Sequence, residues 1–282
     1  MKTLIISLLL LLTVNAQTYR KAVLLHHSTG NRIYQYTVTD AEYTGAEVES
    51  EVVSYNTAKG YTGSDTVSFD ERWWPIPPQG NFWWIWHYIM DGNDPTEPID
   101  DFWALCDTFD VIVIKNGLDE VTGVDSASYW LNTIFNIKYH LREIVTMLEA
   151  HPNTFFVIWP IAPKTDFYVT AEEAGWANWV NVWARDTLQA GLDSYGTFPD
   201  NVYIWDMMSR IEDENHYESL YYAKSAEDDH PNENAADTLA PLFVNEIFDA
   251  AIAYENRGKW LRSSNGRRIF LSDGKSIIMA DE

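Results

Sequence analysis

The sequence predicts an α/β protein, a three-layer α/β/α sandwich with a mainly parallel sheet. Short runs of β-branched and aromatic residues lack alternation, which is typical of strands that are buried on both faces of a sheet. Between them lie segments with apolar residues at every third or fourth position, as in helices that bury one face. The chain has 282 residues, of which 46% are hydrophobic and 22% charged. It is therefore long and apolar enough to form one large core.

The first 16 residues have the layout of a secretory signal peptide. Lys2 gives a basic start, an apolar run extends from Leu4 to Val14, and the small residue Ala16 stands before the expected cleavage point. The apolar run is shorter than the ~20 residues that span a bilayer. We therefore expect cleavage after Ala16 and a secreted or periplasmic protein without a membrane anchor.

The charge balance excludes several classes of partner. The chain contains 19 Lys and Arg residues against 42 Asp and Glu residues, a formal net charge of −23. Such a chain repels a phosphate backbone, so nucleic acid and anionic membrane surfaces are not expected partners. Aromatic residues make up 15% of the chain, which suggests that some rings are displayed for stacking on a glycan. The single cysteine, Cys106, excludes an intramolecular disulfide.

The predicted elements alternate along the chain. A strand over Arg20–His26 is followed by turn residues, and a second strand is predicted to end near Ser54–Asn56. Residues Gly60–Pro98 contain five prolines and five tryptophans and are interpreted as a long functional loop or subdomain. The remaining predicted elements are a buried strand at Asp110–Lys115, a helix within Ser126–Glu149, a strand at Phe155–Trp159, a helix around Ala171–Leu192, a strand at Val202–Trp205 and a last helix at Asn234–Tyr254. One domain is thus expected over residues 17–256, followed by a hairpin or tail at 257–282.

Polar residues follow these strands at the edge where a parallel sheet binds its ligands. A serine hydroxyl needs an imidazole to take its proton and a carboxylate to orient that imidazole. Ser28 follows the first strand, and His230 stands before the last helix with Glu227 and Asp228. We predict Ser28 as nucleophile, His230 as general base and either Glu227 or Asp228 as the acid. The Ser28 N–H and the Asn116 side chain are candidates to receive the oxyanion.

Each of these residues also has a plainer interpretation. Ser28 is a common type of helix N-cap, and His230 before Pro231 can simply open the last helix. Asn116-Gly117 is a favoured turn pair. The acidic residues can be a solvated face of an acidic protein.

The two ends of the chain, Leu24–Gly30 and Asp228–Asn232, together with Asn116-Gly117 after a central strand, resemble the SGNH (GDSL-like) hydrolases. The resemblance covers Lys21–Tyr254. It implies a flavodoxin-like sandwich and a serine esterase without a cofactor, acting through an acyl-enzyme on esters that include acetylated sugars. It also implies that Ser28 is both nucleophile and oxyanion donor.

The chain departs from the family pattern at several points. His26-His27-Ser28 stands where the family has Gly-Asp-Ser. The family's acid lies three residues before the histidine, which is Glu227 here, while Asp228 is one residue nearer. Either Asn116 or Asp119 takes the place of the oxyanion amide, and an Asp there would weaken catalysis. The oxyanion glycine is one of three residues, Gly60, Gly63 or Gly80.

An aromatic stretch, Trp73–Tyr88, supports a second function. Phe82, Ile85, Trp86 and Ile89 have the spacing of a buried helix face. Trp83, Trp84 and His87 are then expected to face outward and, with His27, to bind substrate. The alternative is a non-catalytic carbohydrate-binding protein on the same fold.

No metal is predicted. The sequence lacks a His-x-x-x-His or Cys-x-x-Cys spacing, and Asp91–Asp94 is interpreted as a turn. The candidate ligands considered are His26, His27, His87, Asp228 and His230. The expected partner is a small-molecule or glycan ester.

Overall fold

The fold is described by a computed structural model. It describes residues 19–36, 44–74, 82–92, 102–116, 121–125, 128 and 130–257, and the backbone of three strands at 260–262, 268–272 and 276–279. The predicted signal peptide and the candidate residues Gly80, Gly117 and Asp119 lie outside these residues, as does part of the turn predicted at Asp91–Asp94.

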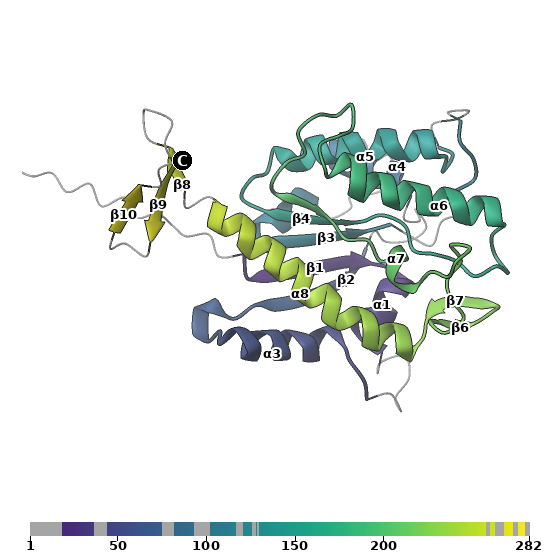
Figure 1. Ribbon diagram of the computed structural model, residues 1–282, viewed down its shortest axis with the longest axis horizontal. Coiled ribbons are helices and arrows are strands. Elements are labelled where there is room, and N and C mark those ends of the chain that lie inside the picture. Colours follow the sequence, from purple (N-terminus) through teal and green to yellow (C-terminus); the bar gives the residue numbers. More distant parts are fainter. Residues whose placement is uncertain are drawn as a thin grey trace, which may run out of the picture.

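A five-stranded parallel sheet forms the centre of the molecule, in the order β2-β1-β3-β4-β5. All four pairings between neighbouring strands are parallel. The sheet and its flanking helices confirm the predicted α/β class and the three-layer arrangement (Figure 1). The strands are β1 (Lys21–His26), β2 (Ser68–Trp73), β3 (Val111–Lys115), β4 (Phe155–Trp159) and β5 (Val202–Ile204).

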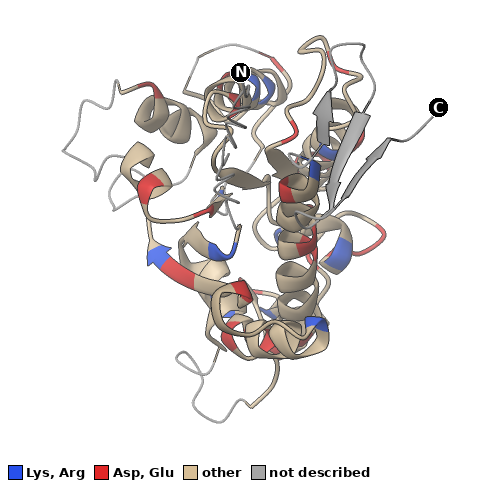
Figure 2. Ribbon diagram, turned by 90° about the vertical axis from the view of Figure 1, so that its left-hand side faces the viewer, with Lys and Arg blue, Asp and Glu red and all other residues tan. Residues whose placement is uncertain are grey.

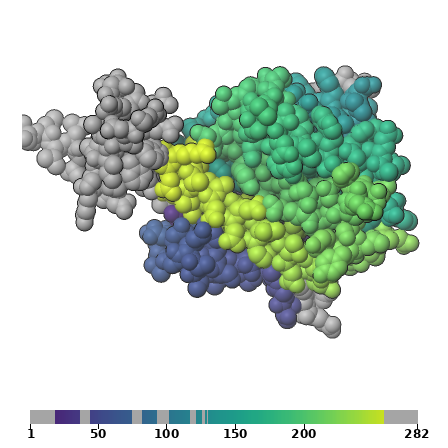
Figure 3. Space-filling model, in the orientation of Figure 1, coloured from purple at the N-terminus to yellow at the C-terminus, as the bar shows by residue number. Residues whose placement is uncertain are grey.

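Helices cover both faces of this sheet. Alternate residues of a strand point to opposite faces, so Ile112 and Ile114 belong to one core cluster while Val111 and Val113 belong to the other. The first cluster lies under α4 (Trp83–Asp91), α5 (Ile134–Glu149) and α6 (Ala171–Trp183). The second lies under α1 (Ser28–Tyr34), α3 (Val48–Lys59) and α8 (Glu233–Arg257). In Figure 3, α8 runs diagonally across the visible face in yellow, beside the blue α3.

Capping residues explain where several helices begin and end. The Thr133 hydroxyl accepts a hydrogen bond from the Asn136 N–H at the start of α5. Thr170 and Glu173 form a capping box at the start of α6. Gly60 ends α3 with a positive φ of 70°, a conformation that glycine adopts without steric cost.

Two expectations about the N-terminal half are corrected. The strand predicted to end at Ser54–Asn56 is wrong, because this segment lies within α3. Its buried residues Val48, Val52 and Tyr55 recur at a spacing of three or four, which is helical. The next strand, β2, lies instead at Ser68–Trp73, inside the segment predicted to be irregular, and forms the edge of the sheet.

Shorter elements complete the chain. A two-stranded hairpin, β6 (Ala223–Ser225) and β7 (Asp228–Pro231), directly precedes α8. A three-stranded antiparallel sheet lies in the segment predicted as a hairpin or tail, with the order β10-β9-β8. The remaining elements are η1 (Gly63–Asp65), η2 (Phe102–Asp107), η3 (Ala184–Leu188), α7 (Met208–Ile211), β8 (Trp260–Arg262), β9 (Arg268–Ser272) and β10 (Ser276–Met279). None of the described helices combines the length and apolarity that are needed to cross a membrane.

Candidate active site

Ser28 is the first residue of α1, directly beyond the carboxyl end of β1. His27, with an extended backbone, makes the turn between the two elements, and its carbonyl accepts the first helical hydrogen bond from the Asn31 N–H. Ser28 is half-buried. This position gives it a hydroxyl at the edge of the sheet and a free N–H in the first turn of a helix.

Gly30 allows α1 to pack this closely on β1. A Cβ built on Gly30 would lie 2.4 Å from the Cβ of His26 and 2.8 Å from its Cγ. Since real Cβ atoms do not approach other atoms so closely, only glycine fits here without a displacement. The position of Ser28 therefore depends on Gly30.

His26 is a buried structural member of this edge. Its Nδ1 lies 2.7 Å from the His27 carbonyl oxygen, and its Nε2 lies 2.8 Å from a carboxylate oxygen of Glu71 at the end of β2. Burial lowers the pKa of His26, although both of these contacts act in the opposite direction. Both ring nitrogens are engaged, so His26 is not available as the base for Ser28.

The structure pairs His230 with Asp228. Nδ1 of His230 donates to Oδ1 of Asp228 at 2.7 Å, and both side chains are half-buried on β7. Burial acts to raise the pKa of Asp228, but the hydrogen bonds from His230 outweigh it and lower that pKa. A donating Nδ1 leaves Nε2 as the basic nitrogen, which is the tautomer that a general base requires.

Within the described part of the chain, no hydrogen bond or ion pair joins Glu227, the other candidate acid, to His230. Glu227 is exposed, and its carbonyl oxygen accepts a hydrogen bond from the Tyr168 hydroxyl at 2.8 Å. In the family pattern the acid lies three residues before the histidine. The carboxylate that is hydrogen-bonded to His230 lies two residues before it.

The hairpin that carries Asp228 and His230 contacts α1, which begins at Ser28. Figure 1 shows the hairpin and α1 at the same end of the molecule. No hydrogen bond joins the Ser28 hydroxyl to His230 in the described part of the chain. The structure therefore brings α1 and the hairpin together but does not show a continuous set of hydrogen bonds from Ser28 through His230 to Asp228. Catalytic hydrogen bonds are often longer in a protein without ligand.

Asn116 lies at the same edge, directly after β3. Its side chain is only 1% exposed, and neither its Oδ1 nor its Nδ2 has a hydrogen-bond partner among the described residues. Buried amides are rarely left unpaired, so this amide group is available to a ligand or an intermediate. The neighbouring Lys115 is equally buried, and its ammonium group donates to the Asn116 carbonyl oxygen at 2.6 Å.

Sequence reasoning missed two buried carboxyl groups beside the His230 pair. Glu218 is 2% exposed, and neither of its carboxylate oxygens has a hydrogen-bond partner in the part of the chain that the structure describes. Burial and the charges of Asp229 and Asp228 raise the pKa of Glu218 to about 9. Burial also raises the pKa of Asp229. A sequence with many acidic residues does not show which of their carboxyl groups will be buried.

The expected outward-facing aromatic residues are partly corrected. Trp83 is 1% and His87 7% exposed, so the expectation that both rings face outward is wrong. Each belongs to the buried side of α4 because this helix packs on α5, and His87 Nδ1 lies 3.0 Å from His140 Nδ1. Trp84 is half-buried and meets the exposed Trp130 edge to face, with 5.2 Å between ring centroids.

Trp73, at the start of the aromatic stretch, was not predicted to bind substrate but lies against the residue that precedes Ser28. Trp73, the last residue of β2, is 48% exposed and stacks on His27, with 4.9 Å between ring centroids and 10° between planes. His27 is the residue before Ser28. An accessible aromatic surface therefore adjoins the candidate nucleophile.

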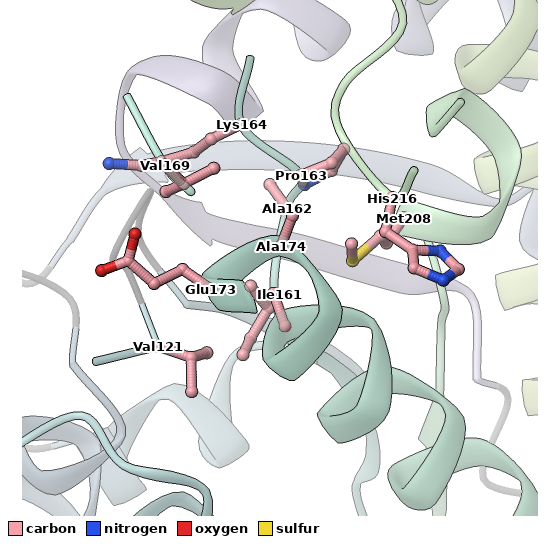
Figure 4. A pocket seen from close by; sticks show the side chains of 11 residues that line it. Val121, Ile161, Ala162, Pro163, Lys164, Val169, Glu173, Ala174, Met208 and His216 are labelled. Atoms are coloured by element: carbon pink, nitrogen blue, oxygen red, sulfur yellow. The ribbon is translucent and has the colours of Figure 1, made fainter. Parts of the chain in front are cut away.

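Two cavities lie elsewhere. A cavity of about 10 Å³, enough for one water molecule, is enclosed between the chain after β4 and α6. Figure 4 shows Glu173 and Lys164 on one side of it and His216 and Met208 on the other. A cavity of about 400 Å³ lies at the opposite edge of the sheet, where Phe155 begins β4 and Val202 begins β5. Neither cavity is lined by Ser28 or His230.

Three possible metal ligands lie together in the described part of the chain, Asp228, Asp229 and His230, with ligand atoms within 4.8 Å of one another. The Nδ1 of His230 and one oxygen of Asp228 are already hydrogen-bonded to each other. The group is thus better described as a carboxylate–imidazole pair beside a second carboxyl group.

Acidic residues predominate over the described fold. Figure 2 shows Asp and Glu spread over several helices, strands and loops, with fewer Lys and Arg between them. No protein-family model matches this chain, and no curated protein matches it. What is shown is therefore an α/β protein with a five-stranded parallel sheet and a set of polar side chains at its carboxyl edge.

Proposed function

We propose that this chain is a secreted or periplasmic serine esterase of the SGNH (GDSL-like) type. The observation that carries the proposal is the 2.7 Å hydrogen bond between Asp228 and His230, on a hairpin that contacts the helix beginning at Ser28. The strand order 2-1-3-4-5 is that of flavodoxin-like folds, which bind their ligands at this edge.

The proposed reaction is acyl transfer. Ser28 Oγ attacks the ester carbonyl carbon while its proton passes to Nε2 of His230, and the carbonyl electron pair moves to oxygen. The tetrahedral intermediate expels the alcohol, which takes the proton from His230, and an acyl-enzyme remains. Water then attacks the acyl carbon by the same route, releasing the acid. The Ser28 N–H and the unpaired Asn116 amide are the proposed oxyanion donors.

The proposed substrate is an ester of a short acyl group, most simply acetyl on a carbohydrate. The net charge of −23 favours a neutral ester over an anionic one. The exposed ring of Trp73 beside His27 offers a flat apolar surface of the kind that binds a sugar ring.

The test is labelling with a fluorophosphonate probe, which reacts only with an activated serine. The purified protein is expected to be labelled at Ser28, as located by peptide mapping, and Ser28→Ala to be unlabelled while it stays folded. Thr29→Ala is the matched control, because its hydroxyl is adjacent but buried. A well-folded wild-type protein that is not labelled, or a Ser28→Ala variant that is, would contradict the proposal.

A carbohydrate-binding protein without activity is the second candidate, and the exposed stack of Trp73 on His27 favours it. In that case Trp73→Ala is expected to weaken binding to a panel of glycans, whereas Ser28→Ala leaves it unchanged. Trp183→Phe, which alters a buried tryptophan of α6, serves as control. Glycan binding that is absent, or indifferent to Trp73, would count against this candidate.

A further inference from the structure

Lys115 is the one lysine or arginine that is buried in the described part of the chain. It is the last residue of β3 and is 1% exposed. An ammonium group loses a large hydration free energy on burial unless the protein supplies compensating partners. The partners of this buried cation therefore determine where its positive charge is held.

The fold holds the Lys115 ammonium group at the carboxyl edge of the sheet. Nζ donates to the carbonyl oxygen of Asn116 at 2.6 Å and lies 5.3 Å from the ring centroid of Trp159, the last residue of β4. The Lys115 carbonyl oxygen accepts from the Trp86 indole N–H at 3.3 Å. Two hydrogen bonds thus fix the main chain here: one from the Lys115 ammonium group to the Asn116 carbonyl oxygen and one from the Trp86 indole to the Lys115 carbonyl oxygen.

This position lies next to the start of α1. The register pairs Ile114 of β3 with Leu25 of β1, so the next residues, Lys115 and His26, are neighbours at the ends of adjacent strands. Burial is the main cause that lowers the pKa of His26, and the positive charge of Lys115 acts in the same direction. Ser28 follows two residues after His26.

We propose that Lys115 is a positioning residue for the oxyanion: its ammonium group fixes the main chain at Asn116 and places a positive charge beneath the point where the oxyanion forms. This inference rests on the proposed function. Charge develops on the substrate oxygen only in the transition state, so a fixed cation there lowers the barrier without tightening substrate binding. The unpaired Asn116 amide would make the direct contact.

A side-chain amide at a strand end can donate a hydrogen bond to an oxyanion, but it carries no net charge. Lys115 adds a positive charge, which opposes the negative potential of the acidic chain. Lys115 acts through Asn116 and through the local potential, and it does not touch the substrate itself.

The experiment compares Lys115→Met with Lys115→Gln and Lys115→Arg, using hydrolysis of p-nitrophenyl acetate by the full chain. We expect Lys115→Met to lower kcat about 100-fold with KM changed by less than about twofold. Lys115→Gln keeps a donor but no charge and should stay near the Met variant. Lys115→Arg keeps the charge and should recover about tenfold of the loss.

Lys138→Met is the matched control. Lys138 lies over the rings of Trp179 and Trp183, at 4.9 and 4.8 Å, on the helical layer away from Ser28. Its loss removes a comparable cation–aromatic contact, and kcat should stay at the wild-type value. This control separates the general loss of such a contact from the specific effect of Lys115.

The outcomes distinguish the two proposals. A wild-type protein that labels at Ser28, with Lys115→Met or Lys115→Gln as fast as wild type, would overturn the role of Lys115 alone. A wild-type protein that neither labels nor hydrolyses esters would overturn both. If Lys115→Met does not fold, the comparison of Lys115→Gln with Lys115→Arg decides, because equal kcat in these two would show that the charge is not needed.

Discussion

The hydrogen bond between Asp228 and His230 determines which nitrogen of the imidazole is basic. With Nδ1 donating to Oδ1 of Asp228 at 2.7 Å, Nε2 is left with its lone pair. An amide at position 228 could present its N–H₂ group to Nδ1 and favour the opposite tautomer. The identity of the acid is therefore open to a direct test, because Glu227 offers an adjacent carboxylate that no hydrogen bond or ion pair joins to the ring among the described residues.

Asp228→Asn is expected to lower kcat about 10³- to 10⁴-fold, because it removes the acceptor that orients His230. Glu227→Gln is the matched control and should leave kcat within about twofold, since Glu227 is exposed. The measurement is steady-state hydrolysis of p-nitrophenyl acetate with far-ultraviolet circular dichroism as a check of folding. If Glu227→Gln lowered kcat more than Asp228→Asn, the catalytic acid would be Glu227 instead.

Glu218 makes the stability of the protein depend on pH. Its pKa is raised to about 9 by burial and by Asp229 and Asp228, from an ordinary value of 4.5. Between these two pH values the folded state holds one proton that the unfolded state has released. The free energy of unfolding therefore falls as pH rises, by about 1.4 kcal/mol per pH unit while that difference is complete.

Glu218→Gln removes this titration while it keeps the size of the side chain. We expect the variant to be close to wild type in stability near pH 5 and increasingly more stable than wild type up to pH 9. Urea unfolding across this pH range measures the difference. Glu212→Gln, which alters a less buried acid of the same loop, is the control. A stability difference that does not change with pH would show that Glu218 is ionised in the folded protein.

At the scale of the elements, the packing of α1 on β1 positions Ser28. The closest point of this packing is Gly30 over His26, where a side chain has no room. Gly175 in α6 offers the opposite case, because a Cβ there would meet no atom within 4 Å. The same substitution at these two helical glycines therefore separates the effect of close packing from that of helix propensity.

Gly30→Ala is expected to destabilise the protein by about 1–3 kcal/mol, because α1 must move away from His26 to admit the methyl group. Gly175→Ala should instead stabilise it by about 0.5–1 kcal/mol through the better helix propensity of alanine. Urea unfolding gives both values, and fluorophosphonate labelling reports whether Ser28 is displaced in Gly30→Ala. Equal stability of the two variants would mean that α1 does not need this close approach.

The sequence was informative where local pattern and burial coincide. The unbroken apolar runs that became β3 and β4 allowed both strands to be predicted. The strand predicted in the segment of α3 is wrong because Val52 and Val53 favour strands only locally. The buried residues of this segment instead form one narrow helical face. Ser28, Asn116 and His230 could be predicted as candidates because they stand next to predicted strand ends or helix starts. Glu218, Lys115 and Gly30 could not, since their burial and close contacts come from distant parts of the chain.

At the scale of the whole molecule, the net charge of −23 sets the potential around the site. Figure 2 shows acidic residues spread over separate helices, strands and loops, so the field is not confined to one patch. Such a potential lowers the local concentration of anions and leaves neutral molecules unaffected. Salt screens it, because the Debye length falls from ~30 Å at 0.01 M to ~3 Å at 1 M ionic strength.

This field predicts a salt dependence that differs between substrates of different charge. For p-nitrophenyl hemisuccinate, an anionic ester, kcat/KM should rise about tenfold when ionic strength increases from 0.01 to 1 M. For neutral p-nitrophenyl acetate it should change by less than about twofold, which makes this ester the internal control. Initial rates at limiting substrate measure both values on one enzyme preparation. Parallel changes for the two esters would mean that salt acts on the protein itself. A higher kcat/KM for the anionic ester at low salt would mean that a local positive potential, such as that of Lys115, outweighs the charge of the whole molecule at the site.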